Sequence, residues 1–197
     1  MIDAKFSLEF PRSRYETRPL SELGAVLTGK TPPTSRGGMF GGEIPFVTPG
    51  DLEGETPAQR SVTNEGALLS KTVAAGSVLV CCIGTIGKTG IASETVAFNQ
   101  QINAVEWSDS VDPVYGLYAV RQLKPLMRSQ GDSTTLPILP KSRFGALEIP
   151  VPDMKVQREF SQFSSAVWVA AKSVRAALAQ DDALFDSLQA RAFKGEL

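Results

Sequence analysis

The side chains in this sequence that could carry out covalent chemistry are few. Histidine is absent from the 197 residues, which removes the usual general base near neutral pH and the commonest metal ligand. The two cysteines, Cys81 and Cys82, are adjacent and follow an apolar run, so we expect small buried hydrophobic residues rather than a disulfide, a metal pair or a nucleophile. Asp51, Glu53 and Glu55 cluster in a stretch more typical of a solvated loop than of a metal site. The sequence therefore predicts no catalytic residue and no metal.

One segment resembles the end of a phosphate-binding loop, because Gly87 is followed by lysine and threonine. That loop needs another glycine five positions earlier, where this sequence has Cys82. Residues 90–92 also predict a strand rather than the helix that must follow such a loop. We interpret the segment as a glycine-rich turn between two strands, with Lys88 at its tip. A Gly-x-Gly-x-x-Gly motif is absent too, so no dinucleotide, methyl-donor or other cofactor is expected.

Polar loops offer side chains of the kind that bind nucleic acids. One loop covers residues 28–38 and a second covers 130–135, while an Asn-Gln-Gln run at 99–101 lies in a strand context. Serine, threonine and backbone N–H groups hold phosphates, whereas Arg, Lys, Asn and Gln recognise base edges. Loops of this composition are also common as plain solvated connections. The candidate DNA-binding residues are Lys30, Thr31, Arg36, Lys88, Gln100, Ser133, Lys141 and Arg143.

The elements that would position these residues are short strands, turns and a few helices. Apolar runs at 77–83 and 96–98 predict strands, and residues 102–107 alternate with period two, as a half-buried strand does. An aspartate followed by proline predicts a helix over about 113–125, and a further short helix fits within 140–147. The fold class expected is a mixed α+β globular domain, with a long C-terminal coiled-coil helix after it.

From residue 153 the pattern becomes that of one long helix. Pro152 and Asp153 form a start signal, and Gly195 is the only glycine or proline that follows. Apolar residues then recur at alternating spacings of four and three, as in the seam of a coiled coil. A local irregularity near residues 180–182 would keep the seam apolar towards the end of the helix. The residues assigned to a dimer interface are Val156, Phe160, Phe163, Val167, Val174, Phe185 and Leu188.

The length of this helix indicates a partner. Forty residues of α-helix are on the order of 60 Å long, which exceeds what a small domain can cover. Pairing with another long helix is therefore favoured over a terminal helix folded back on its own domain, although the second arrangement stays possible. The expected organisation is a globular DNA-binding domain at 1–152 and a dimerisation or spacer helix at 153–197.

The overall composition neither favours nor excludes DNA as a ligand. The net charge is −1, with 14 Lys/Arg and 15 Asp/Glu in residues 1–152 and six of each in residues 153–197. A DNA-binding protein of this kind must gather its cations on one face or share phosphate contacts with a partner. No apolar run approaches the roughly 20 residues of a membrane span, and the first residues lack a signal-peptide pattern. A cytoplasmic protein is expected.

The order of the segments resembles the specificity (S) subunit of type I restriction-modification systems, from about Leu20 to the C-terminus. The segments are Leu-Ser-Glu-Leu-Gly at 20–24, Thr-Gly-Lys-Thr-Pro at 28–32, Gly-Glu-Ile-Pro-Phe-Val-Thr-Pro-Gly-Asp-Leu at 42–52, Gly-Ser-Val-Leu-Val at 76–80, Gly-Thr-Ile-Gly-Lys at 84–88, Asn-Gln-Gln at 99–101, Leu-Glu-Ile-Pro-Val-Pro at 147–152, Gln157, and Phe-Lys-Gly-Glu-Leu at 193–197.

The resemblance implies a target recognition domain followed by a helical region, in a subunit without catalytic activity. Such a subunit recognises double-stranded DNA and docks methyltransferase (M) subunits, which methylate adenine, and a restriction (R) subunit, which cleaves DNA. A usual S subunit contains two recognition domains and two helical regions, whereas this chain has one of each. The sequence therefore resembles a half-length form, and two copies are expected to pair antiparallel through their helices.

Two other functions stay open. The chain could be a coiled-coil scaffold or adaptor whose first domain binds protein, and the near-neutral charge of that domain favours this alternative. It could also be a small enzyme that uses Lys88 or Cys82, although no supporting base or oxyanion constellation is present in the sequence.

Overall fold

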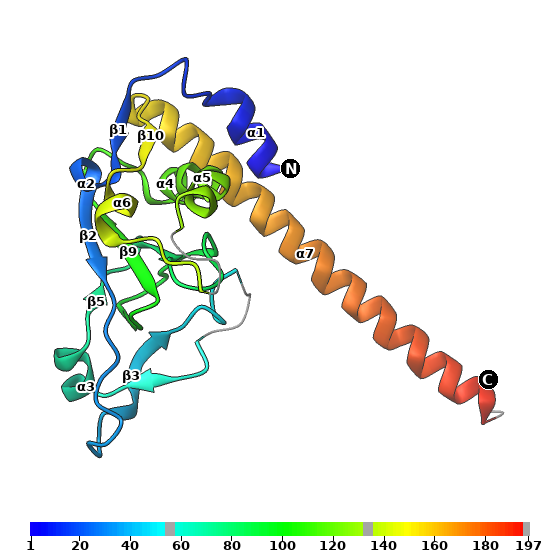
Figure 1. The fold of residues 1–197 in the computed structure, drawn as a ribbon. Coiled ribbons are helices and arrows are strands. Elements are labelled where there is room, and N and C mark those ends of the chain that lie inside the picture. Colours follow the sequence, from blue (N-terminus) through cyan, green and yellow to red (C-terminus); the bar gives the residue numbers. More distant parts are fainter. Residues whose placement is uncertain (54–57, 132–135, 195–197) are drawn as a thin grey trace.

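The computed structural model describes residues 1–53, 58–131 and 136–194. It has a globular part and one long helix that begins inside it and then runs away from it (Figure 1). The helices are α1 (Ile2–Glu9), α2 (Leu20–Leu23), α3 (Asn64–Leu69), α4 (Pro113–Gln122), α5 (Lys124–Ser129), α6 (Lys141–Gly145) and α7 (Met154–Phe193). The strands are β1 (Thr17–Pro19), β2 (Gly24–Thr28), β3 (Phe40–Val47), β4 (Ser61–Val62), β5 (Thr72–Val73), β6 (Val78–Cys81), β7 (Thr89–Ile91), β8 (Val96–Phe98), β9 (Ile102–Trp107) and β10 (Glu148–Pro150).

Two four-stranded sheets form the framework of the globular part. The first has the order β2-β9-β6-β7 and is antiparallel throughout. The second has the order β4-β3-β8-β5, in which β3 and β8 run parallel. A separate pair, β1 with β10, joins the start of the globular part to the segment just before α7. Because β10 ends just before α7 begins, the pairing of β1 with β10 fixes where α7 departs.

The core has three layers of apolar contacts, which follow from the alternation of side chains along each strand. In β6, Val78 and Val80 face the helices, whereas Leu79 and Cys81 face the second sheet. The same division holds in β9, so residues 102–105 are all buried. The prediction that this strand is half-buried is therefore wrong, because helices cover one face of its sheet and the second sheet covers the other. A third, small cluster lies on the outer face of the second sheet around Phe46.

Aromatic rings dominate the layer between the first sheet and the helices. Phe6 of α1 lies 5.1 Å from Tyr115 of α4 and 5.1 Å from Phe160 of α7, between ring centroids. Phe160 also meets Tyr118 at 5.4 Å in an edge-on arrangement. Because aromatic side chains bury large areas, this cluster binds the first helix, the middle helix and the start of the long helix into one core.

Buried polar contacts fix the beginning of α7. The side-chain amide of Gln157 accepts from the backbone N–H of Asp112 at 2.9 Å and donates to the carbonyls of Pro152 and Ser110 at 2.9 and 3.1 Å. Ser161 donates to the carboxylate of Asp112, which also caps α4 by accepting from two backbone N–H groups. The first turns of the long helix are thus part of the globular structure.

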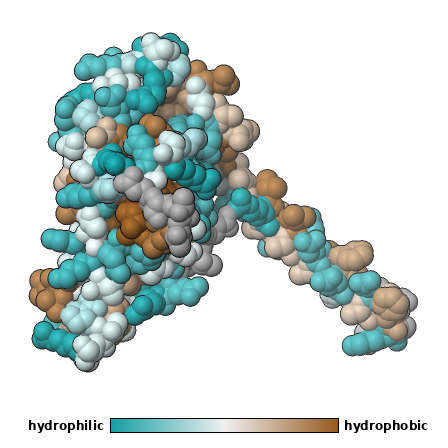
Figure 2. All heavy atoms as spheres, in the orientation of Figure 1, coloured by the Kyte–Doolittle hydropathy of each residue, from teal (hydrophilic) through white to brown (hydrophobic). Residues whose placement is uncertain are grey.

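The end of α7 projects from the globular part. From Lys172 to Lys194 every described side chain is exposed. Apolar side chains recur along this projecting part, as Figure 2 shows. We call residues 172–193 the arm. The helix continues without interruption through residues 180–182, and a shift of the seam there stays a prediction.

Most elements expected from the sequence are present. Strands β6, β8 and β9, helices α4 and α6 and the long helix lie where periodicity and capping signals predict them. The helix α1 was not predicted. No described helix is both long enough and apolar enough to cross a membrane.

Candidate nucleic-acid interface

The loop after β2 is pinned to the turn between β8 and β9. The backbone N–H of Gly29 donates to the carbonyl of Ile102, and that of Lys30 donates to the carbonyl of Phe98, each at 3.0 Å. A Cβ atom on Gly29 would lie 2.1 Å from the carbonyl oxygen of Asn99, so only glycine permits this approach. The hydroxyl of Thr31 then donates to the amide oxygen of Gln100 at 2.6 Å. Three of the candidate residues therefore meet in one place, which we call the loop hub (Lys30, Thr31 and Gln100).

Helix α3 holds the same loop at its other side. Arg36 forms an ion pair with Glu65 of α3. Thr63 caps the helix by accepting from the N–H of Gly66 at 3.0 Å, and its hydroxyl donates to the carbonyl of Gly38 at 2.7 Å. Arg36 would have to leave Glu65 in order to contact a phosphate. This change is inexpensive, because exposed ion pairs contribute about 1 kcal/mol or less.

Lys88 does not lie at the tip of its turn, which corrects the sequence prediction. Its backbone carbonyl accepts from the N–H of Cys81 at 2.9 Å, so Lys88 continues the ladder between β6 and β7. The side chain is half-buried, and its ammonium lies 3.5 Å from the carbonyl oxygen of Pro49. Thr85 is the exposed residue of the turn. The segment is nevertheless a turn between two strands, as predicted.

The remaining candidates form a second, separate group. Lys141 and Arg143 are exposed on α6. The guanidinium of Arg143 donates to the backbone carbonyl of Gln130 at 3.1 Å, which ties α6 to the chain that follows α5. Ser133 lies outside the described residues. The structure thus joins Lys30, Thr31, Arg36 and Gln100 through the loop after β2, while Lys88 bonds to Pro49 and Arg143 to Gln130.

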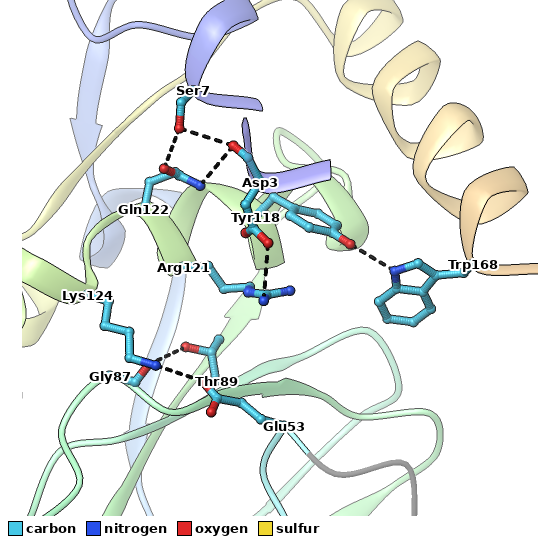
Figure 3. Close-up of polar contacts among 10 residues, drawn as sticks. All are labelled: Asp3, Ser7, Glu53, Gly87, Thr89, Tyr118, Arg121, Gln122, Lys124 and Trp168. Carbon is cyan, nitrogen blue, oxygen red and sulfur yellow. Dashed lines mark hydrogen bonds and ion pairs between the residues drawn. The ribbon is translucent and has the colours of Figure 1, made fainter. Parts of the chain in front are cut away.

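The reactive side chains considered first have structural roles. Burial raises the pKa of the Cys82 thiol to about 12, so it stays protonated and unreactive near neutral pH. The carboxylate of Asp51 accepts from the N–H and hydroxyl of Thr48, each at 2.7 Å. Glu53 pairs with Lys124 at 3.0 Å (Figure 3), and Glu55 lies outside the described residues. The described part of the chain contains no group of acidic or cysteine side chains that could hold a metal ion.

The predicted dimer seam divides into two parts. Phe160 packs into the globular core and is only 3% exposed, so its assignment to an interface between chains is corrected, while Val156 is half-buried against the same core. Phe163 lies at the border, with the ammonium of Lys5 4.7 Å from its ring centroid. Val167 is half-buried. The last members, Val174, Phe185 and Leu188, are exposed on the arm.

Two features of these surfaces were not foreseen from the sequence. The indole N–H of Trp168 donates to the hydroxyl of Tyr118 at 2.9 Å and fastens α7 to α4 at the edge of the globular part (Figure 3). The guanidinium of Arg60 lies over the rings of Phe40 and Phe46. Both contacts join residues far apart in sequence, and no local pattern signals them.

Comparisons with known proteins all point to type I restriction-modification specificity subunits. The sequence model described as "Type I restriction modification DNA specificity domain" matches residues 12–167. The chain is 29% identical over 153 residues to the type I restriction enzyme HindI specificity subunit of Haemophilus influenzae, covering 72% of this chain and 33% of that protein. It is 25% identical over 158 residues to the MjaIX specificity subunit of Methanocaldococcus jannaschii, covering 75% and 36%. The chain thus spans about a third of these relatives (33% and 36%).

Solved structures share the fold. The HsdS subunit from Thermoanaerobacter tengcongensis matches with a TM-score of 0.68 and 19% identity, over 100% of this chain and 50% of that one. A chain from a structural study of assembly and conformational transition in the type I R-M system matches with a TM-score of 0.73 and 21% identity, over 100% and 51%. Globular part and long helix together therefore correspond to about half of each of these chains.

Proposed function

The chain belongs to the family of type I restriction-modification DNA specificity domains, and from this premise we propose that it recognises one half of a two-part DNA site. In this proposal it has no catalytic activity of its own. Methylation of adenine and cleavage of DNA belong to separate M and R subunits, which it brings to the site in the cytoplasm. The observation that carries the proposal is the family match, which runs through both large sheets and into the first turns of α7.

The geometry of the loop hub supports DNA as the ligand. Lys30 and Gln100 are exposed, and the Thr31 hydrogen bond takes the amide oxygen of Gln100, so the amide N–H donors are not used in that contact. Lysine suits a phosphate and an amide suits a base edge. Both groups are held on a loop fixed at its backbone, which lowers the entropy lost on binding.

The net charge of −1 is compatible with this role if the M subunits supply many of the phosphate contacts. Phosphate contacts provide most of the sequence-independent affinity for DNA. A specificity domain that contributes mainly base contacts needs few cations of its own. We therefore expect weak DNA binding by the isolated chain and stronger, more salt-sensitive binding by its complex with M subunits.

We further infer that two copies pair antiparallel through the arm. Val174, Leu178, Phe185 and Leu188 follow the spacing of a coiled-coil seam and are 40–68% exposed, which leaves their apolar surface in water unless a partner covers it. The same stripe is covered inside the chain at Phe160, whereas Phe163 is 37% exposed and the stripe stays exposed along the arm. Two-fold symmetry would match an inverted repeat in the DNA.

The test is to co-express the chain with the M subunit encoded beside it, purify the complex and map adenine methylation in the host genome. We expect a stable complex and one methylated, interrupted motif that disappears when this chain is deleted. A complex that forms without producing any motif would contradict DNA recognition. It would favour the scaffold alternative, in which the globular part binds protein.

A further inference from the structure

Arg60 has an unusual environment for an exposed arginine. Its guanidinium carbon lies 4.4 Å from the ring centroid of Phe40 and 5.7 Å from that of Phe46. The two rings meet edge-on, with centroids 5.8 Å apart and planes at 88°. Within the described ranges, the guanidinium donates no hydrogen bond and pairs with no carboxylate. Aromatic faces therefore position the group, while its N–H donors stay available.

Two other arginines stack on aromatic rings, and each differs from Arg60 either in its ion pairing or in its place in the fold. Arg121 lies 5.3 Å from the ring centroid of Tyr118 but also pairs with Asp3 at 3.3 Å (Figure 3), so its charge is satisfied within the chain. Arg14 lies 5.4 Å from the ring centroid of Tyr15, next to the β1–β10 pair, and is exposed like Arg60. Arg14 thus shares the stacking of Arg60 but lies on a different part of the fold, which makes it a matched control.

Arg60 lies on the outer face of the second sheet. Phe46 belongs to the small cluster on that face, whereas its neighbour Val47 faces the first sheet. Phe46 also pairs with Ala97 of β8, and the next residue, Phe98, binds the backbone of Lys30 through its carbonyl. Arg60 therefore precedes β4 of the second sheet, and the loop hub lies beside the end of β8 in that sheet. The backbones of Arg60 and Lys30 are separated by three strand spacings, from Arg60 to β3, from β3 to β8 and from β8 to Lys30, or about 14 Å, which is about four base steps at 3.4 Å each.

A purely structural role would be to shield the cluster around Phe46, which the aliphatic stem of an arginine can do. A lysine stem would do this equally well. The planar group gives something more, since stacking fixes the direction of its paired N–H donors. That direction matters for guanine, whose O6 and N7 accept two parallel hydrogen bonds in the major groove. A phosphate can also accept two parallel N–H bonds from a guanidinium, and replacing single guanines distinguishes the two ligands.

We propose that Arg60 is a specificity-determining residue that donates two hydrogen bonds to O6 and N7 of one guanine in the recognised half-site. The inference rests on the proposed function and extends it to a residue and a base. Stacking on Phe40 and Phe46 holds the guanidinium before DNA arrives, so little side-chain entropy is lost on binding.

The test uses the full chain in complex with its M subunit and duplexes that carry the methylated motif. Each guanine of the half-site is replaced in turn by 7-deazaguanine, which lacks the N7 acceptor. We expect one position at which replacement weakens binding by the wild-type complex by about tenfold. For Arg60→Ala, the same replacement at that position should have no effect. Arg60→Lys should keep the salt-dependent, non-specific part of binding and lose the discrimination.

Arg14→Lys and Arg14→Ala are the controls, and both should keep the full cost of the replacement. Thermal unfolding of each variant checks that the fold is intact. The proposal is overturned if the half-site contains no guanine, if no replacement weakens wild-type binding, or if Arg60→Lys discriminates as well as wild type. A wild-type complex that neither binds duplex DNA nor methylates any motif would instead refute the proposed function, and this inference with it.

Discussion

The two ends of α7 present the same apolar stripe to different surroundings. At its beginning, Phe160 is 3% exposed among four aromatic rings of the globular part. On the arm, Phe185 is 66% exposed. The spacing of apolar residues is alike in both places. A helical period determines which residues share a face, but it does not determine what covers that face. What covers that face depends on how far the globular part extends along the helix. Here the globular part covers only the first turns.

The globular part and the arm also differ in what stabilises them. The globular part is held by packed cores, whereas the arm has helical hydrogen bonds and side chains in water. Isolated helices are marginally stable, since most helical stability in proteins comes from packing of the apolar face. A change in the stripe should therefore affect folding at one end and association at the other.

The largest effect is expected for Phe160→Ala. Removing a buried phenylalanine leaves a cavity and should lower the free energy of unfolding by about 3–5 kcal/mol. Phe185→Ala should change it by less than about 0.5 kcal/mol when measured at concentrations where the chain is monomeric. Urea unfolding followed by circular dichroism gives both values. Equal losses for the two variants would mean that the arm is folded onto the globular part in solution.

Pairing of two copies should depend on the arm rather than on the beginning of α7. We expect the double variant Phe185→Asp and Leu188→Asp to weaken pairing of two copies by a hundredfold or more, because each loses a burial worth about 1.5–3 kcal/mol. The unfolding of the globular part should not change. Sedimentation or light scattering over a range of concentrations measures the pairing. Ala183→Asp, on the opposite face of the helix by its spacing, is the matched control and should still pair. Full pairing by the double variant would place the interface elsewhere.

The smallest effect is expected at the border between the two regions. Trp168→Phe removes the hydrogen bond to Tyr118, which should cost about 0.5–1 kcal/mol, since Trp168 is half exposed. Tyr118→Phe should lose a similar amount, and the double variant no more than either one alone. Hydrogen exchange of the backbone around residue 168 measures this locally. Additive losses would show that the two side chains do not interact in solution.

Local signals explain how much of the fold and site could be predicted. An aspartate before a proline, a period of two, and a spacing of three and four each depend on neighbours in sequence, and they located α4, β9 and α7. Helix α1 has no such signal. It forms because Phe6 packs against Tyr115 and Phe160, which are far away along the chain. The prediction that β9 is half-buried is wrong for the same reason, since periodicity cannot show that a second sheet covers the face of β9 turned away from the helices.

The candidate site shows the same limit. Composition led to the loop after β2, and the structure brings Lys30, Thr31 and Gln100 together there. The glycine-rich composition of the turn predicts Lys88 at its tip, but strand pairing extends one residue further than the sequence indicates. Arg60 was missed because only the sheet brings it onto Phe40 and Phe46. Side chains whose role depends on a distant partner need the structure.

The packing of Phe6 against Phe160 also sets an order of events during synthesis. A ribosome adds about 5–20 residues per second, so the first helix is made roughly 10–30 s before the ring that completes its core. During that interval Phe6 and Phe10 lack one of their aromatic neighbours. The beginning of α7 is thus the segment that closes the globular core, and nascent chains stalled before it should leave the N-terminal helix open to proteases and chaperones.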